Sequence, residues 1–326
     1  MVKNVRIRVI DVVHKATSDF DEMKGVDTNK LDALTNRCAL AVKTALEIAP
    51  KGISEIQQSC LIDIFESLRY THQTIRLLLR QGADSPIAAD SLPMSRLQVE
   101  MLYSLCLMVE DFSNIDWYMK HSWKQSYRRH LLQEREVEDL PRFKNWIGGE
   151  ARGLFEKLRS IAGVSDAEVA TIESEELGTP LPPGVIATPI RMFPAPSRAI
   201  DHVKDPRRKQ MLMRFYPEYQ ALSSHVHGSS SQMRILKTLL NPRSPYRRFF
   251  TSSDIEKMFQ RMAEDAIWIS FLSIVQAASE MVALYPADTH LRATLAEGWQ
   301  PLTESHLLAR AIWEMRTRSL LGVLSG

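Results

Sequence analysis

SLPMSRLQVEMLYSLCLMVED, residues 91–111, is the stretch that indicates how this chain folds. Apolar residues occupy nearly every side of a helix drawn through it, and a helix of that kind is buried on all sides. Ser91 is placed to cap the helix, and Pro93 then falls in the first turn, where a missing N–H costs nothing. We therefore expect a central helix that other helices surround.

Two opposite charges interrupt this apolar stretch. Arg96 and Glu100 are four residues apart, so they lie on one face of the helix. A buried charge costs several kcal/mol, roughly, unless it is paired or hydrogen-bonded. The pair therefore predicts an internal polar site, which polar groups from another part of the chain must complete.

Helical spacing of apolar residues recurs along most of the 326-residue chain, which has only 13 glycines. Further helices are expected at residues 27–49, 54–82, 117–132, 145–162, 165–178, 197–215, 217–228, 254–285 and 305–321. Capping-box patterns occur at the starts of two of them, Ser54 with Gln57 and Ser165 with Glu168. The sequence thus predicts an all-α fold, a multi-helix bundle.

A proline-rich segment at 179–197 divides the helical pattern. Its six prolines exclude a helix, and its apolar residues favour an ordered crossover along the surface over a free linker. The expected parts are an N-terminal arm at 1–26 and a single helical domain at 27–326, with portions 27–178 and 198–326 packed together across the crossover.

Composition limits the classes of partner. The net charge of +2 gives no overall field that would draw the chain to nucleic acid or membrane, so such a contact would need a local patch. The apolar window 266–285 contains Gln276, Glu280 and three serines, which favours a core helix over a membrane span. The three cysteines show no CxxC pairing and fit a reducing compartment. We expect a cytoplasmic protein without a membrane partner.

A basic and aromatic helix at 117–132 is the one local patch. Its candidate nucleic-acid-binding residues are Lys120, Trp123, Lys124, Tyr127 and Arg128. Basic groups beside aromatic rings could hold RNA phosphates and stack on bases. The alternative is a solvated face whose aromatic residues anchor the helix to the core, with the acidic stretch 134–139 as a partner for the charges.

The usual catalytic signatures are absent from the sequence: there is no Walker loop, GxGxxG, HExxH, GxSxG or zinc-knuckle spacing. His225 and His227 resemble a metal-binding arm, but residues two apart on a helix point to nearly opposite sides. We therefore predict no metal and no cofactor.

A polar line is expected on the helix at 217–228. Tyr219, Ser223 and His227 follow one another at four-residue intervals and so share a face. If this face meets Arg96 and Glu100, the site holds the parts of general acid–base catalysis or of an anion-binding pocket. The alternative is a buried histidine that serves only as a hydrogen-bonding group.

These motifs carry a resemblance to a known family. Ser95-Arg96-x-x-x-Glu100 and the later Tyr219-x-x-Leu-Ser-x-x-Val-His-Gly-Ser are similar to segments of the bacterial domain-of-unknown-function family 5677. The resemblance spans about residues 54–230. It implies an all-helical fold that draws Glu100 and His227 together, and it brings no established activity.

Three functions fit the sequence. The first is a ligand-binding or regulatory module with the Arg96–Glu100–His227 cluster as its site. The second is a metal-independent ribonuclease of the helical toxin type that acts on RNA phosphates. The third is a structural homodimer in contact through the aromatic helix at 117–132.

Overall fold

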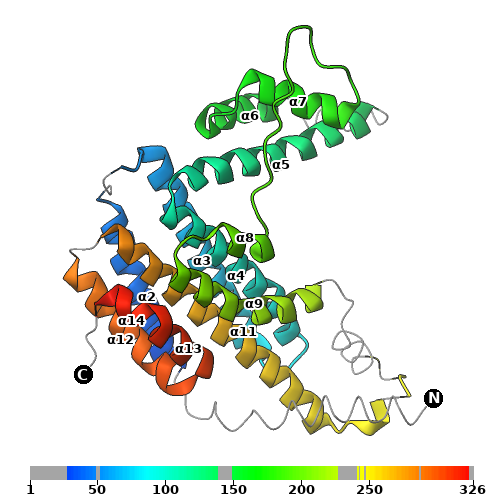
Figure 1. Ribbon diagram of the computed structural model, residues 1–326. Helices are drawn as coiled ribbons and strands as arrows, with labels where there is room; N and C mark the ends of the chain where they lie inside the picture. Colours follow the sequence, from blue (N-terminus) through cyan, green and yellow to red (C-terminus); the bar gives the residue numbers. More distant parts are fainter. Residues whose placement is uncertain are drawn as a thin grey trace.

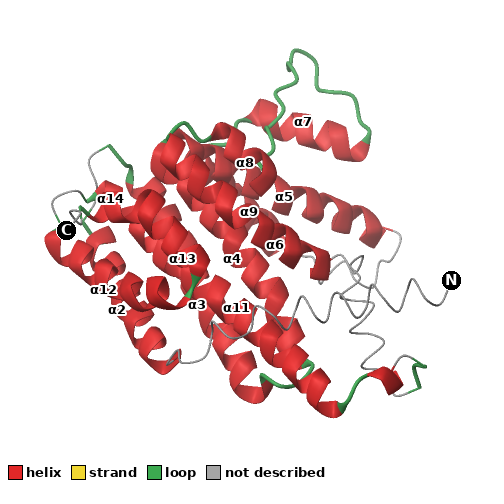
Figure 2. Ribbon diagram, turned by 60° about the horizontal axis from the view of Figure 1, so that its bottom comes forward, coloured by secondary structure: helices red, strands yellow, loops and turns green. Residues whose placement is uncertain are grey.

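The computed structural model describes residues 28–48, 52–138, 149–226, 241, 243–245, 247–285 and 288–322. Every regular element within these ranges is a helix, and green in Figure 2 marks only the loops between them. The predicted all-α fold is therefore confirmed. The N-terminal arm at 1–26 and the candidate site residue His227 lie outside the described residues.

One helix, α4 (Ile87–Glu110), lies at the centre of the bundle (Figure 1). It contacts α3 (Glu55–Gly82), α8 (Pro196–His202), α9 (Pro206–Val226) and α11 (Ser252–Met281). Leu92, Val99, Leu102, Leu105 and Met108 on different sides of α4 are all buried. The expectation of a central helix enclosed by other helices is thus confirmed.

The predicted start of this helix was wrong. Pro86 is the N-cap, five residues before Ser91, and Ser91 is a buried interior residue that donates to the Ala88 carbonyl at 2.5 Å. Pro93 therefore lies inside α4 rather than in its first turn. A helix interior tolerates proline here because packing on several sides outweighs the lost N–H.

Two further predicted helix boundaries were wrong. The predicted helix at 217–228 does not exist by itself, because α9 runs unbroken through Pro217. The predicted helix at 197–215 is divided at 203–205, where Asp205 caps α9 by accepting the backbone N–H groups of Arg207 and Arg208. Both helices begin at a proline, Pro196 of α8 and Pro206 of α9, whereas the later Pro217 lies inside α9.

The long helix α11 continues into the 3₁₀ turn η4 (Val282–Leu284). Its N-cap is Thr251, which forms a capping box with Asp254, so the start predicted at 253–254 is two or three residues late. Ser252–Leu284 is long and apolar enough to cross a membrane by length and composition, yet 89% of its apolar window is buried in the bundle.

The remaining bundle helices pack at one end of α11. They are α2 (Thr28–Leu46), α12 (Thr289–Ser305), α13 (Leu307–Ile312), the π-helical turn η5 (Trp313–Thr317) and α14 (Arg318–Leu321). A short 3₁₀ turn, η3 (Arg247–Phe249), precedes α11. The helix α12 was not predicted, because Gly298 and Pro301 interrupt its pattern.

Three helices form a separate unit that projects from the bundle (Figure 1). They are α5 (Ser113–Glu138), α6 (Gly149–Ala162) and α7 (Asp166–Leu177). The unit has its own small core of Trp123, Leu131, Ala162, Val164, Ile172 and Ile190. The crossover predicted at 179–197 contains no helix as far as residue 195, and α8 begins within its last two residues. Ile190 of the crossover is buried in the small core and Phe193 in the main one.

Candidate functional site

Four of the predicted site residues meet where α4 packs against α9. The Arg96 guanidinium donates from Nη2 to Glu100 Oε1 at 2.8 Å and to the Tyr219 hydroxyl at 3.2 Å. Its Nε donates to Ser223 Oγ at 3.0 Å. The Tyr219 hydroxyl donates in turn to Glu100 Oε1 at 3.1 Å. The polar line on α9 therefore faces the charged pair on α4.

This cluster is less enclosed than the sequence predicted. The side chain of Arg96 is 21% exposed and that of Glu100 is 30% exposed, so both are half-buried rather than internal. The reason is that α4 directs its other faces into the core and turns this one toward the edge of the α4–α9 contact. Solvent therefore reaches the pair without a change of fold.

Two polar atoms of the cluster remain available. Among the residues that the structure describes, neither Nη1 of Arg96 nor Oε2 of Glu100 has a partner, and neither atom is shut off from solvent. The guanidinium and the carboxylate of this ion pair thus each keep one atom that can form a further hydrogen bond. The histidine that was expected to join them, His227, lies outside the described residues, as does the side chain of His225.

The predicted RNA-binding face of α5 is occupied by the protein itself. Lys120 Nζ lies 2.8 Å from Glu168 Oε1, and Tyr127 donates to Glu173 at 2.5 Å. Lys124 is buried and contacts Glu175 and the Ile190 carbonyl. Arg128 forms an ion pair with Glu176. Trp123 is buried, and its indole N–H donates to the Phe155 carbonyl.

The acidic helix α7 is thus the main partner of this basic face. The expectation of an open surface is corrected. The physical reason is that α7 brings four glutamates, from residue 168 to residue 176, against α5. The side chains at 136–139, which belong to the stretch predicted as the acidic partner, lie outside the described residues.

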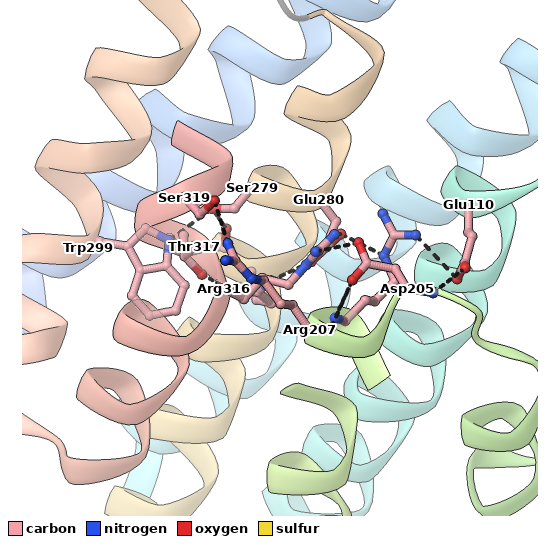
Figure 3. Close-up of polar contacts among 12 residues, drawn as sticks. Glu110, Asp205, Arg207, Ser279, Glu280, Trp299, Arg316, Thr317 and Ser319 are labelled. Atoms are coloured by element: carbon pink, nitrogen blue, oxygen red, sulfur yellow. Dashed lines mark hydrogen bonds and ion pairs between the residues drawn. The ribbon is translucent and has the colours of Figure 1, made fainter. Parts of the chain in front are cut away.

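A second polar cluster, which sequence analysis missed, lies inside the bundle (Figure 3). Glu280 on α11 has no exposed surface, and each of its carboxylate oxygens accepts two hydrogen bonds. Oε1 accepts from Arg316 Nε at 2.5 Å and from Gln276 Nε2 at 3.0 Å. Oε2 accepts from Arg316 Nη2 and from Arg208 Nε, both at 2.8 Å.

Two more carboxylates complete this Glu280 cluster. Arg208 also lies 3.3 Å from Glu110, and Arg316 lies 2.8 Å from Asp205. Burial by itself would raise the pKa of Asp205, but the Arg208 backbone N–H and the charge of Arg316 outweigh burial and hold it below its usual value. The cluster joins α4, α9, α11 and η5 through ion pairs, so its role is to hold these elements together.

The signal for this cluster was present in the sequence. Glu280 and Gln276 interrupt the apolar window at 266–285 in the same way that Arg96 and Glu100 interrupt residues 91–111. A carboxylate in a helix that is apolar on all sides predicts a buried cation elsewhere. Nothing in the spacing, however, identifies Arg208 and Arg316 as its partners.

A chain of three further polar residues links α2, α3 and α11. His72 Nδ1 lies 2.7 Å from Ser270 Oγ, and His72 Nε2 lies 3.3 Å from Asp32 Oδ1. These are the residue types of a hydrolase triad. Ser270 has no exposed surface, however, so no substrate carbonyl can reach its hydroxyl. The arrangement is therefore a structural one in this state of the protein.

The described residues form neither a metal site nor a reactive thiol site. Within the described ranges, no three His, Cys, Asp or Glu side chains are arranged to hold a metal ion. Burial raises the pKa of the Cys38 thiol to about 12 and that of the Cys60 thiol to about 11, so both are protonated at neutral pH.

Comparison of the chain with models of known protein families, with curated proteins and with solved structures finds no match. The function proposed below therefore rests on the geometry of the Arg96 cluster.

Proposed function

We propose that the cluster of Arg96, Glu100, Tyr219 and Ser223, here called the Arg96 site, recognises a small polar ligand, and that the protein is a ligand-binding or regulatory module. The observation that carries this proposal is the pair of open atoms, Arg96 Nη1 and Glu100 Oε2, at a solvent-accessible edge. Together they would accept a ligand that presents an anionic group beside a hydrogen-bond donor.

The support around Arg96 favours recognition over a simple surface ion pair. Its guanidinium is fixed by three side chains, and the Tyr219 ring lies 5.4 Å from Cζ. A donor that is already oriented loses little entropy when a ligand binds, which raises affinity. Guanidinium is also the group best suited to carboxylate or phosphate oxygens.

The chemistry of the open atoms narrows the ligand class. An anionic oxygen would bind Arg96 Nη1, and an ammonium or amide N–H would bind Glu100 Oε2. Free α-amino acids are the simplest molecules that carry both groups at a short separation. Both open atoms belong to α4, whereas Tyr219 and Ser223 of α9 hold the Arg96 guanidinium in place, so binding would depend on the contact between helices from the two sides of the crossover.

Thermal unfolding in the presence of each common L-amino acid tests the proposal. A ligand at 100 times its Kd stabilises the folded state by about 2.7 kcal/mol, which is a readily measured rise in Tm. We expect at least one amino acid to raise Tm saturably, and Arg96→Gln to abolish the rise. Arg69→Gln is the matched control, because Arg69 forms a half-buried pair with Glu66 on another helix. No saturable rise, or equal losses in both variants, would contradict the proposal.

A further inference from the structure

A groove lies between α3 and α6, with α5 as its floor. It consists of two adjoining hollows of about 310 and 460 Å³, which share Ile56 of α3, Met119 of α5 and Ile161 of α6. The groove therefore separates the projecting unit from the bundle along one side. It belongs to different helices from the Arg96 site.

One wall of the groove continues into an exposed apolar stripe on α6. Leu154, Leu158 and Ile161 are 56%, 40% and 50% exposed, and their spacing of four and three residues places them on one face. The other face of α6 packs on α5 through Phe155 and Ala162. An exposed apolar stripe beside a hollow is typical of a surface that another molecule covers.

The opposite wall is acidic. Glu55, Ser59, Asp63 and Ser67 follow one another at four-residue intervals along α3 and line the larger hollow. Glu55 and Asp63 are exposed, and their carboxylates have no partner among the residues that the structure describes. They stand beside the apolar line of Ile56, Cys60 and Ile64, which also borders this hollow.

The pKa of the Cys60 thiol reflects the same acidic surroundings. Burial raises its pKa to about 11, and the neighbouring carboxylates of Asp63 and Asp116 act in the same direction. Both carboxylate oxygens of Asp116 accept from the Gln57 side-chain amide, at 3.1 and 3.2 Å. The groove thus combines an apolar lining with an uncompensated acidic wall.

We propose that this groove binds an amphipathic helix of a partner protein, with the apolar face of that helix against the groove and its Lys or Arg residues beside Glu55 and Asp63. A helix fits because both walls are helices whose side chains form ridges at four-residue intervals. The line from Ile56 to Ile64 spans roughly 12 Å at a rise of 1.5 Å per residue, enough for about two turns of the partner. The acidic wall selects a basic partner by charge complementarity.

A model peptide tests the proposal on the full chain. The probe is a fluorescein-labelled peptide of about 14 residues, with leucines at i, i+3, i+4 and i+7 and lysines at the other positions. We expect saturable binding by fluorescence anisotropy, weakened about tenfold between low and high salt. A scrambled peptide of the same composition, and a peptide with glutamate in place of each lysine, should bind at least about tenfold more weakly.

Variants locate the binding surface. Glu55→Lys/Asp63→Lys should weaken the Lys peptide at least about tenfold and strengthen the Glu peptide, because the charge of the wall is reversed. Leu158→Asp should weaken both peptides. Glu47→Lys/Glu256→Lys is the matched control, since it changes the net charge equally at exposed residues outside the groove, and it should leave the Kd within about twofold.

Four results would overturn the proposal. If Glu47→Lys/Glu256→Lys weakened peptide binding as much as Glu55→Lys/Asp63→Lys, the binding would reflect only general attraction between opposite charges. Equally tight binding of the scrambled peptide would lead to the same conclusion. Absence of saturable binding would show that the groove does not accept a basic amphipathic helix. Self-association in sedimentation velocity that Leu158→Asp abolishes, without peptide binding, would instead assign the groove to a second copy of this chain.

Discussion

Arg316 and Glu280 form a two-point ion pair with no more than a trace of exposed surface. Nε of Arg316 donates to Oε1 at 2.5 Å and Nη2 donates to Oε2 at 2.8 Å, across 36 residues of chain. Arg316 lies in the π-helical turn Trp313–Thr317, and turns of this kind are rare and tend to be kept for a specific contact. Here the turn places a guanidinium over the buried carboxylate of α11.

Loss of this carboxylate should destabilise the bundle. Glu280→Gln leaves Arg208 and Arg316 buried beside an amide that cannot neutralise them, and breaking a buried ion pair costs about 3–5 kcal/mol. Urea unfolding at neutral pH measures this loss directly. Glu297→Gln is the control, because its pair with Arg37 is more than half exposed and contributes at most about 1 kcal/mol. Similar small losses in both variants would show that water enters the Glu280 cluster.

Local spacing was enough to predict part of the candidate site. Arg96 with Glu100 and Tyr219 with Ser223 are both i,i+4 pairs, so each pair could be placed on a helix face before the fold was known. That the two faces meet was a guess about tertiary structure. The same applies to α5, whose basic face was evident, whereas its partner Glu168, 48 residues from Lys120, was not. The spacing of residues shows which side chains share one face of a helix, but it does not show which helix faces pack together.

The predictions of helix boundaries were wrong for a different reason. Pro93, Pro217 and Pro301 all lie inside helices, although each was expected to mark a start or prevented a prediction. Helix propensity is a local energy of a few kcal/mol at most, and burial of a helix on several sides outweighs it. Capping boxes were more reliable, since those of Ser54 and Ser165 satisfy backbone N–H groups whatever packs nearby.

Acid should weaken the contact between α2 and α3. Burial would raise the pKa of Asp32, but hydrogen bonds from His72 and Arg76 outweigh burial and hold it below the usual 3.8. An acid with a depressed folded-state pKa stabilises the fold above its unfolded pKa and loses that contribution as pH falls through its folded pKa. The stability difference between the parent and Asp32→Asn should therefore be largest above about pH 4 and shrink below it.

Urea unfolding at several pH values measures this difference. We expect Asp32→Asn to cost about 1–3 kcal/mol at neutral pH, because it leaves a buried hydrogen-bonding position of His72 without its carboxylate. Asp84→Asn removes the same charge at an exposed residue and is the control. A difference for Asp32→Asn that stays constant from neutral pH to about pH 3 would exclude the assigned pKa shift.

The projecting unit should open locally when Glu168 is removed. Its carboxylate accepts from Lys120 at 2.8 Å and from the Ser165 backbone N–H at 2.8 Å, so Glu168→Ala breaks both an ion pair and a capping box. The expected cost is about 1–3 kcal/mol. Because α5, α6 and α7 have their own small core, hydrogen exchange should accelerate in α7 and leave α4 and α11 unchanged.

Glu175→Ala provides the matched comparison on the same helix. Its carboxylate is nearly half exposed and lies 3.5 Å from Lys124, which keeps the Ile190 carbonyl as an acceptor, so its loss should cost less than the loss of Glu168. Exchange that accelerates equally in the bundle after Glu168→Ala would show that the projecting unit and the bundle unfold as one cooperative body.

Two glycines on helices should respond to alanine with opposite signs. A Cβ at Gly298 of α12 would lie 2.9 Å from the buried Cys38 Sγ of α2, so Gly298→Ala must push the two helices apart. Overpacking of this kind costs about 1–3 kcal/mol. A Cβ at Gly153 of α6 meets nothing within 4 Å, and Gly153→Ala should stabilise by up to about 1 kcal/mol through helix propensity. Thermal unfolding of the two variants distinguishes these outcomes.

Cys38→Ala removes the sulfur that the new Cβ of Gly298→Ala would meet. The stability cost of Gly298→Ala should therefore fall in the Cys38→Ala background. An unchanged cost would show that another contact holds the two helices apart.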